Sequence, residues 1–226
     1  MPEKRMLLKA LAIVSLLLAT SMGAAAPNGI VISQFVTRGP TGGNDEFVEL
    51  YNTSSSAVDI GGWQMQGCSS GSPGTASNRV VVTTGFVLEP GRYYLFTNSG
   101  SAPNYSLGVP GDQTYTTGFT DFTTTNFSGI RLLDAAGTPQ DGVGSPQSPC
   151  REGAGITTPA VNGASNAFVR LNGGTQDTDG NADDFAGPGA ANPHKAPSGN
   201  YVYNFVRNSR GSLLIRPTID STGAIV

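Results

Sequence analysis

Two short runs decide the fold: Asn44-Asp45-Glu46-Phe47-Val48-Glu49-Leu50-Tyr51-Asn52 and Val58-Asp59-Ile60-Gly61-Gly62-Trp63. In the first run Phe47, Glu49 and Tyr51 alternate with Val48 and Leu50, which is the period of a strand with at least one buried face. A polar link then predicts a turn, and a Gly pair lets the backbone bend before the single Trp of the chain. We expect that Trp to fill the middle of a core. The pattern predicts the central hairpin of an all-β sandwich.

These runs resemble the signature of the lamin tail domain family, in the form found in secreted bacterial proteins. The motif residues that carry the resemblance are Glu46, Phe47, Val48, Glu49, Leu50, Asn52, Gly62 and Trp63. Further motifs follow the family order at residues 30–36, 88–95, 177–185 and 192–193. The resemblance implies an immunoglobulin-like β-sandwich with structural roles for the motif residues. It implies no single biochemical activity, because a fold carries many functions.

The first 26 residues have the pattern of a secretory signal peptide. Basic residues at positions 4, 5 and 9 precede an uncharged, apolar stretch that ends in small residues. We expect cleavage after Ala25 or Ala26, and Pro27 makes the second choice the poorer substrate. The apolar run is short for a membrane span, which needs about 20 residues. The sequence therefore predicts an exported protein, secreted or held at the cell envelope, with no membrane span in the mature chain.

The charge balance after export is acidic. Removing residues 1–26 takes three basic and one acidic residue from totals of 13 and 16, which leaves 10 and 15 and a net charge of −5. Lys195 is then the only lysine. This balance does not support binding to nucleic acid phosphates, which requires a basic surface. The 31 glycines and 15 prolines favour strands joined by long loops.

The chain divides into one domain and a short extension. Residues 27–198 predict the sandwich, with a long loop expected at residues 98–126. In residues 199–226, Tyr201, Tyr203 and Phe205 alternate with less aromatic positions, and a turn precedes residues 213–216. This pattern predicts an added C-terminal β-hairpin that packs on the sandwich or offers a docking edge. The alternative is a partly disordered tail.

Two cysteines follow the signal peptide, Cys68 and Cys150. In an exported chain they predict one disulfide, which would fasten a Pro/Ser-rich loop to the sheet. A catalytic thiol is disfavoured, because the only His is in a distant loop flanked by Pro.

One acidic loop is the candidate for metal binding. The predicted ligands are Asp177, Asp179, Asn181, Asp183 and Asp184. Oxygen ligands at alternate positions of a tight loop can converge on a calcium ion, which here would have a structural role. The match to an EF-hand is incomplete, since Gly180 is at the fourth position and the twelfth is not Glu. The alternative is that these side chains only form local turns with the backbone.

No residue is predicted to be catalytic. Glu46 and Glu49 are an odd number of positions apart, so on a regular strand they point to opposite faces and cannot form a dyad. We expect them to bind loop amides or an Arg. His194 is expected to be solvated, and no nucleophile-elbow motif is present.

These observations support a non-catalytic extracellular module that binds or tethers an unidentified partner, such as a protein, an envelope polymer or a nucleic acid. Two alternatives remain. One is a small metal-dependent hydrolase that uses the acidic loop. The other is an assembly subunit that docks through the C-terminal hairpin.

Overall fold

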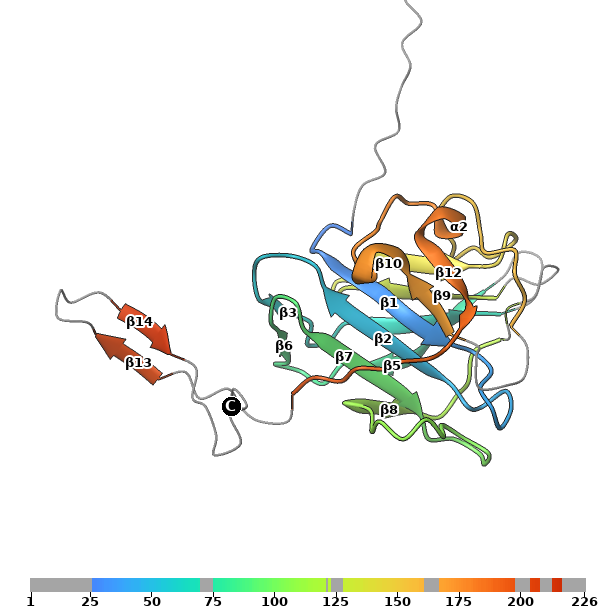
Figure 1. Ribbon diagram of the computed structural model, residues 1–226, viewed down its shortest axis with the longest axis horizontal. Coiled ribbons are helices and arrows are strands. Elements are labelled where there is room, and N and C mark those ends of the chain that lie inside the picture. Colours follow the sequence, from blue (N-terminus) through green and yellow to red (C-terminus); the bar gives the residue numbers. More distant parts are fainter. Residues whose placement is uncertain are drawn as a thin grey trace, which may run out of the picture.

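The computed structural model describes residues 26–69, 75–120, 122, 128–160 and 167–197, together with the strands Asn204–Arg207 and Leu213–Arg216. The predicted signal peptide lies outside the described residues, apart from Ala26. Two β-sheets form two layers with the core between them (Figure 1).

The larger sheet has six strands, in the order β12 (Phe185–Gly189), β11 (Ala167–Arg170), β1 (Ile30–Val36), β2 (Phe47–Asn52), β7 (Tyr93–Asn98) and β8 (Gln113–Tyr115). The second sheet has four, in the order β10 (Pro139–Gly144), β9 (Gly129–Leu133), β4 (Gln64–Cys68) and β5 (Ala76–Val81). A short pair, β3 (Val58–Asp59) and β6 (Val87–Leu88), closes one end. Two helical turns, α1 (Leu171–Gly174) and α2 (Asn181–Asp184), precede β12. This arrangement is an immunoglobulin-like β-sandwich, as expected.

The alternation of β2 separates the two faces of the larger sheet as predicted. Val48 and Leu50 are fully buried in the main core between the sheets. Phe47 lies on the outer face, in a small second cluster with Val36 and Leu95. The outer face of β2 is therefore also covered, and the residues that cover it come from loops and from the segment after β12.

Trp63 lies in the main core with 4% of its surface exposed, which confirms the prediction. The two glycines before it are required by the backbone. Gly62 has a φ of +80°, and a Cβ on Gly61 would meet the backbone nitrogen of Gly85. The amide of Val82 donates to the Trp63 carbonyl at 2.8 Å, and the amide of Trp63 donates to the Ile60 carbonyl at 3.0 Å, so both backbone polar groups of Trp63 are bonded.

Three other predictions can be compared with the structure. The disulfide between Cys68 and Cys150 is present and joins β4 to the loop after β10. The C-terminal hairpin is present as β13 (Asn204–Arg207) and β14 (Leu213–Arg216), which pair only with each other among the described strands. The long loop at 98–126 is interrupted by β8, which extends the larger sheet in parallel with β7. Among the described residues, no helix has the length and apolarity needed to cross a membrane.

Candidate functional site

The first candidate site is centred on Arg170, at the end of β11. Its side chain is fully buried. Nε donates to the carbonyl of Ile32 at 2.9 Å, and Nη1 donates to the carbonyl of Gln176 at 2.8 Å. The guanidinium carbon lies 4.6 Å from the centre of the Phe185 ring. Arg170 therefore connects β1, the acidic loop and β12 at the edge of the core.

Three carboxylates contact this guanidinium. Nη2 of Arg170 donates to both oxygens of Asp141 at 2.9 and 2.7 Å. Nη1 lies 3.2 Å from Oδ1 of Asp177 and 3.7 Å from Oδ2 of Asp184. Burial opposes the charge on Arg170, but these carboxylates outweigh it and raise its pKa. One guanidinium thus contacts three carboxyl groups.

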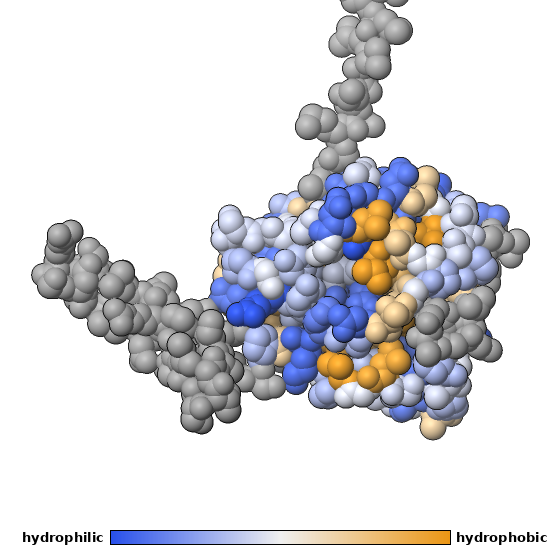
Figure 2. Space-filling view, viewed as in Figure 1, coloured by the Kyte–Doolittle hydropathy of each residue, from blue (hydrophilic) through white to orange (hydrophobic). Residues whose placement is uncertain are grey.

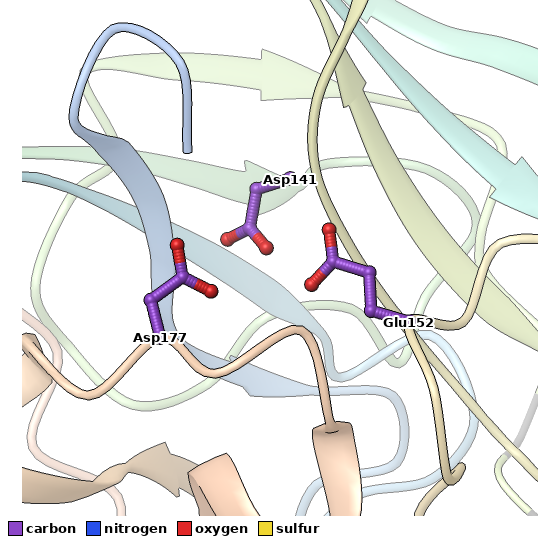
Figure 3. Close-up of side chains that lie close together, drawn as sticks. All are labelled: Asp141, Glu152 and Asp177. Carbon is purple, nitrogen blue, oxygen red and sulfur yellow. The ribbon is translucent and has the colours of Figure 1, made fainter. Parts of the chain in front are cut away.

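Glu152 adds a further carboxyl group to this cluster. Ligand-type oxygens of Asp141, Glu152 and Asp177 all lie within 4.8 Å of one another. Figure 3 shows the three groups pointing toward one another from β10, the loop after it and the acidic loop. Burial and the charges of Asp141 and Asp177 raise the pKa of Glu152 to about 9. Its Oε2 atom is buried and has no hydrogen-bond partner among the described residues. We call Asp141, Glu152, Asp177 and Arg170 the acid cluster.

The acidic loop that was predicted to hold calcium is organised around Asp184 and Asn181. Asp184 accepts bonds from the amide and hydroxyl of Thr178, at 3.0 and 2.8 Å. Asn181 donates to the Gly142 carbonyl at 2.8 Å and accepts from the Glu152 amide at 3.0 Å. The loop is therefore fastened to β10.

The side chains of the five predicted calcium ligands do not all point to one position. Asp177 and Asp184 face Arg170, Asn181 bonds to backbone of β10, and Asp183 is exposed. Asp179 adopts a φ of +53° at the loop apex. Calcium binding by this loop stays a prediction. Asp184 accepts bonds from nearby backbone amides, as the alternative expects, whereas the contacts of Asp177 and Asp184 with Arg170 belong to neither interpretation.

The second candidate site lies on the outer face of the larger sheet, around Glu49. Its Oε1 accepts from the Ser33 hydroxyl at 2.6 Å, and its Oε2 accepts from Nδ1 of His194 at 3.0 Å. His194 stacks on Tyr93 with ring centres 4.5 Å apart. Burial raises the pKa of Glu49, while its bonds to Ser33 and His194 counteract part of that increase. His194 is 43% exposed, so it is anchored on one side and open on the other, in contrast to the solvated His that was expected.

These residues line a small hollow of about 140 Å³, which we call the outer hollow. It is bounded by Ser33, Gln34, Glu49, Tyr93, Val169, Gly173, Gly174 and His194. Figure 2 shows this face of the molecule, where hydrophilic residues gather at the centre with hydrophobic residues above and below them.

The segment after β12 forms one side of this hollow and crosses β1, β2 and β7 (Figure 1). We call residues 190–197 the strap. Asn192 and Gln34 exchange two hydrogen bonds, at 2.8 and 2.9 Å. The Ala196 amide donates to Asp112 at 2.8 Å. The hollow is therefore built on fixed backbone.

The outer hollow does not have the geometry of nucleophilic catalysis. In a catalytic triad the His lies between the nucleophile and the acid, so that it can take the proton from the hydroxyl. Here Glu49 lies between Ser33 and His194 and accepts from both. The hydroxyl of Ser33 is thus held as a donor to Glu49. The same carboxylate binds His194 and so holds the strap in place.

Glu46 bonds to a loop amide, which is one of the contacts expected of it. It accepts hydrogen bonds from the Phe119 amide at 2.9 Å and from Asn98 at 2.9 Å. It therefore holds the segment after β8 against the start of β2. Glu46 and Glu49 serve separate places in the fold and form no dyad.

Sequence reasoning missed Arg170, Asp141 and Glu152. One signal was available, since an Arg that ends an apolar strand just before an acidic loop is well placed for an ion pair. Asp141 and Glu152 gave no such signal, because their contacts come from residues far away in the chain.

The profile of the Lamin Tail Domain family matches residues 23–146 of the chain. The match includes the strands from β1 to β10 and ends before β11, the acidic loop and the strap. A search of curated proteins found no match.

Proposed function

The chain belongs to the lamin tail domain family, and on that premise we propose that it is an exported, non-catalytic module that binds or tethers a partner at the cell envelope or outside the cell. The observation that carries the proposal is the outer hollow. It combines the ring of Tyr93, the exposed edge of the His194 imidazole and the backbone of Gly173 and Gly174 on one face of the larger sheet. Binding residues of β-sandwiches are commonly held by such a scaffold.

The size of the outer hollow indicates what it accepts. Its volume of about 140 Å³ is below the range of about 300–1,000 Å³ that is usual for small-molecule and cofactor pockets. It fits one side chain or one sugar ring that projects from a larger partner. The partner is therefore a macromolecule that lies across the outer face.

The net charge of the chain indicates which classes of partner it can bind. The net charge of −5 after residue 26 and the single remaining lysine disfavour a phosphate backbone. A protein or an uncharged envelope polysaccharide fits better. Export is supported by the signal peptide pattern and by the disulfide, since disulfides persist in oxidising compartments.

A binding experiment on the exported full-length gene product tests this function. The product is incubated with isolated cell envelopes, insoluble polysaccharides and DNA, and the bound fraction is measured by sedimentation. Val169→Glu places a charge at the rim of the outer hollow, where Val169 is 36% exposed. Val81→Glu is the matched control, because Val81 is exposed on β5 in the other sheet.

We expect the Val169→Glu variant to lose most of its binding to the envelope or polysaccharide fraction, and the Val81→Glu variant to bind as the unchanged protein does. Equal binding by both variants would show that the partner does not bind at the outer hollow. Turnover of any polysaccharide or peptide during the incubation would contradict the non-catalytic function.

The hairpin of β13 and β14 supports a second function, as an assembly subunit. Its strands pair with each other and with no other described strand, and a strand edge without a partner can add a strand of another chain. Deleting residues 199–226 and measuring the oligomer size by light scattering tests this function. A size that does not change would argue against assembly through the hairpin.

A further inference from the structure

The first described residue, Ala26, contacts the acid cluster through its backbone nitrogen. This nitrogen donates to Oδ2 of Asp177 at 2.7 Å, across 151 positions of the chain. We propose that cleavage after Ala25 turns this nitrogen into an α-ammonium group that stays bound to Asp177, so that the mature N-terminus provides a second cation for the acid cluster. The proposal rests on the proposed export.

Local contacts fix the position of Ala26. Its carbonyl accepts from the amide of Gly29 at 2.8 Å, which closes a turn before β1. The side chain of Asn28 donates to Gln140 at 2.9 Å, next to Asp141 in β10. The amide of Thr53 donates to the Gly29 carbonyl at 2.8 Å. The turn is thus held by residues that follow Ala26, and removing the residues before Ala26 leaves these contacts in place.

The sequence favours cleavage at the bond that creates this terminus. Small residues occupy Gly23 and Ala25, which are the third and first positions before the bond. Cleavage one residue later would place Pro27 directly after the bond. Ala26 is therefore the expected first residue of the exported chain.

The charges of the acid cluster show why an ammonium group fits there. Ligand-type oxygens of Asp141, Glu152 and Asp177 lie within 4.8 Å of one another, and Asp184 is also near the guanidinium of Arg170. A peptide N–H offers Asp177 one neutral donor. An ammonium group offers it a full positive charge and adds further N–H donors, and charge-assisted hydrogen bonds are about twice as strong as neutral ones.

Glu152 gives independent support. Its Oε2 is buried without a hydrogen-bond partner among the described residues, which is costly unless a donor is supplied. The charges of Asp141 and Asp177 also help to raise the pKa of this carboxyl group. A cation beside Asp177 would offset part of the negative charge that acts on Glu152.

Competitive labelling of amines tests the proposal. The full-length chain is exported by a host cell, and the intact mass of the product gives its first residue. The product is then treated with a trace of acylating reagent at a fixed pH. The label on the α-amine is compared with that on Lys195, the only lysine after residue 26, by peptide mass spectrometry.

We expect the product to begin at Ala26 and its α-amine to react at least about tenfold more slowly in the folded protein than in urea, relative to Lys195. Asp177→Asn should remove this protection. Asp183→Asn should keep it, because Asp183 is an exposed Asp of the same loop. If Asp177→Asn does not fold, inserting one Ser before Ala26 moves the amine away and should remove the protection in its place.

Three results would overturn the proposal. A product that begins at another residue excludes the new terminus. Equal labelling in the folded and urea-treated protein excludes the ion pair. Protection that disappears in a chelator would assign the acid cluster to a metal ion. None of these results depends on partner binding, so they are separate from a failure of the proposed function.

Discussion

Glu49 and His194 are joined by two hydrogen bonds, because one carboxylate oxygen accepts from both the backbone amide and the ring Nδ1 of a residue 145 positions later. Glu49 lies on β2, in the centre of the larger sheet, and His194 lies in the strap. This pair fixes the strap across the outer face and shapes the outer hollow.

Replacing His194 by Ala should loosen the strap. The ring contributes a hydrogen bond to Glu49 and a stack on Tyr93, and its loss leaves a buried carboxylate with one donor fewer. We expect trypsin to cleave after Lys195 about tenfold faster, because proteolysis follows the population of the opened segment. Val87→Ala, at an exposed position on β6, should leave the rate unchanged. Equal rates in both variants would show that the ring does not hold the strap.

Replacing Arg170 by Met should be strongly destabilising. The change leaves the buried carboxyl groups of Asp141 and Asp177 without the guanidinium that they contact. We expect a loss of about 3–5 kcal/mol in the free energy of unfolding, which urea denaturation can measure. Arg131→Met is the control, because Arg131 is only half-buried and bonds to Gln66. It should cost about 1 kcal/mol or less. Similar losses in the two variants would contradict the central role of Arg170.

Glu152 should make stability depend on pH. Burial and the charges of Asp141 and Asp177 raise the pKa of Glu152 from 4.5 to about 9. Between these values the folded chain binds the proton and the unfolded chain does not, so the free energy of unfolding falls as the pH rises.

Glu152→Gln cannot ionise, so its stability should change less between pH 5 and pH 9 than that of the unchanged protein. It should also be the more stable protein near the upper end of that range. Urea denaturation across the range measures the difference, with Asp183→Asn as a control at an exposed acid. If the free energy of unfolding changed with pH equally in the Glu152→Gln variant and the unchanged protein, this prediction would be wrong.

Removing the disulfide should destabilise the sandwich. The bond between Cys68 and Cys150 closes a loop across 82 positions. In the chain-entropy model a loop of this length contributes about 4.5 kcal/mol at most. The urea midpoint of the Cys68→Ala/Cys150→Ala double variant should fall accordingly. A midpoint that does not change would show that the loop after β10 is held by its hydrogen bonds alone.

Trp63→Ala tests the core. Trp63 is 4% exposed and packs between the two sheets, so its removal leaves a cavity. We expect a loss of about 3–5 kcal/mol in the free energy of unfolding. Val81→Ala, at a position that is 48% exposed, should change it by no more than about 0.5 kcal/mol. A small loss at Trp63 would contradict its place in the core.

The features that could be predicted from the sequence are those set by local patterns. Alternation in β2 gave the two faces of the sheet, and a Gly pair followed by Trp63 gave the turn into the core. The disulfide followed from two cysteines in a chain that was predicted to be exported. Each of these predictions needed only neighbouring residues in the sequence or, for the disulfide, the presence of two cysteines.

The acid cluster and the strap could not be predicted in the same way. The partners of Arg170 come from β1, β10 and the acidic loop, and Glu49 meets a residue from the far end of the domain. Such contacts depend on strand order, which no short pattern encodes. The pairing of β8 with β7 was missed for a similar reason, since three residues are too few to show alternation.

The two edges of the larger sheet have a consequence for contact between copies of this protein. One end is β8, with three residues, and the other is β12, where Pro188 has no amide hydrogen to offer a neighbour. Short edges and proline both discourage a second copy from adding itself as another strand. Both edges of the larger sheet are therefore poor templates for fibril growth.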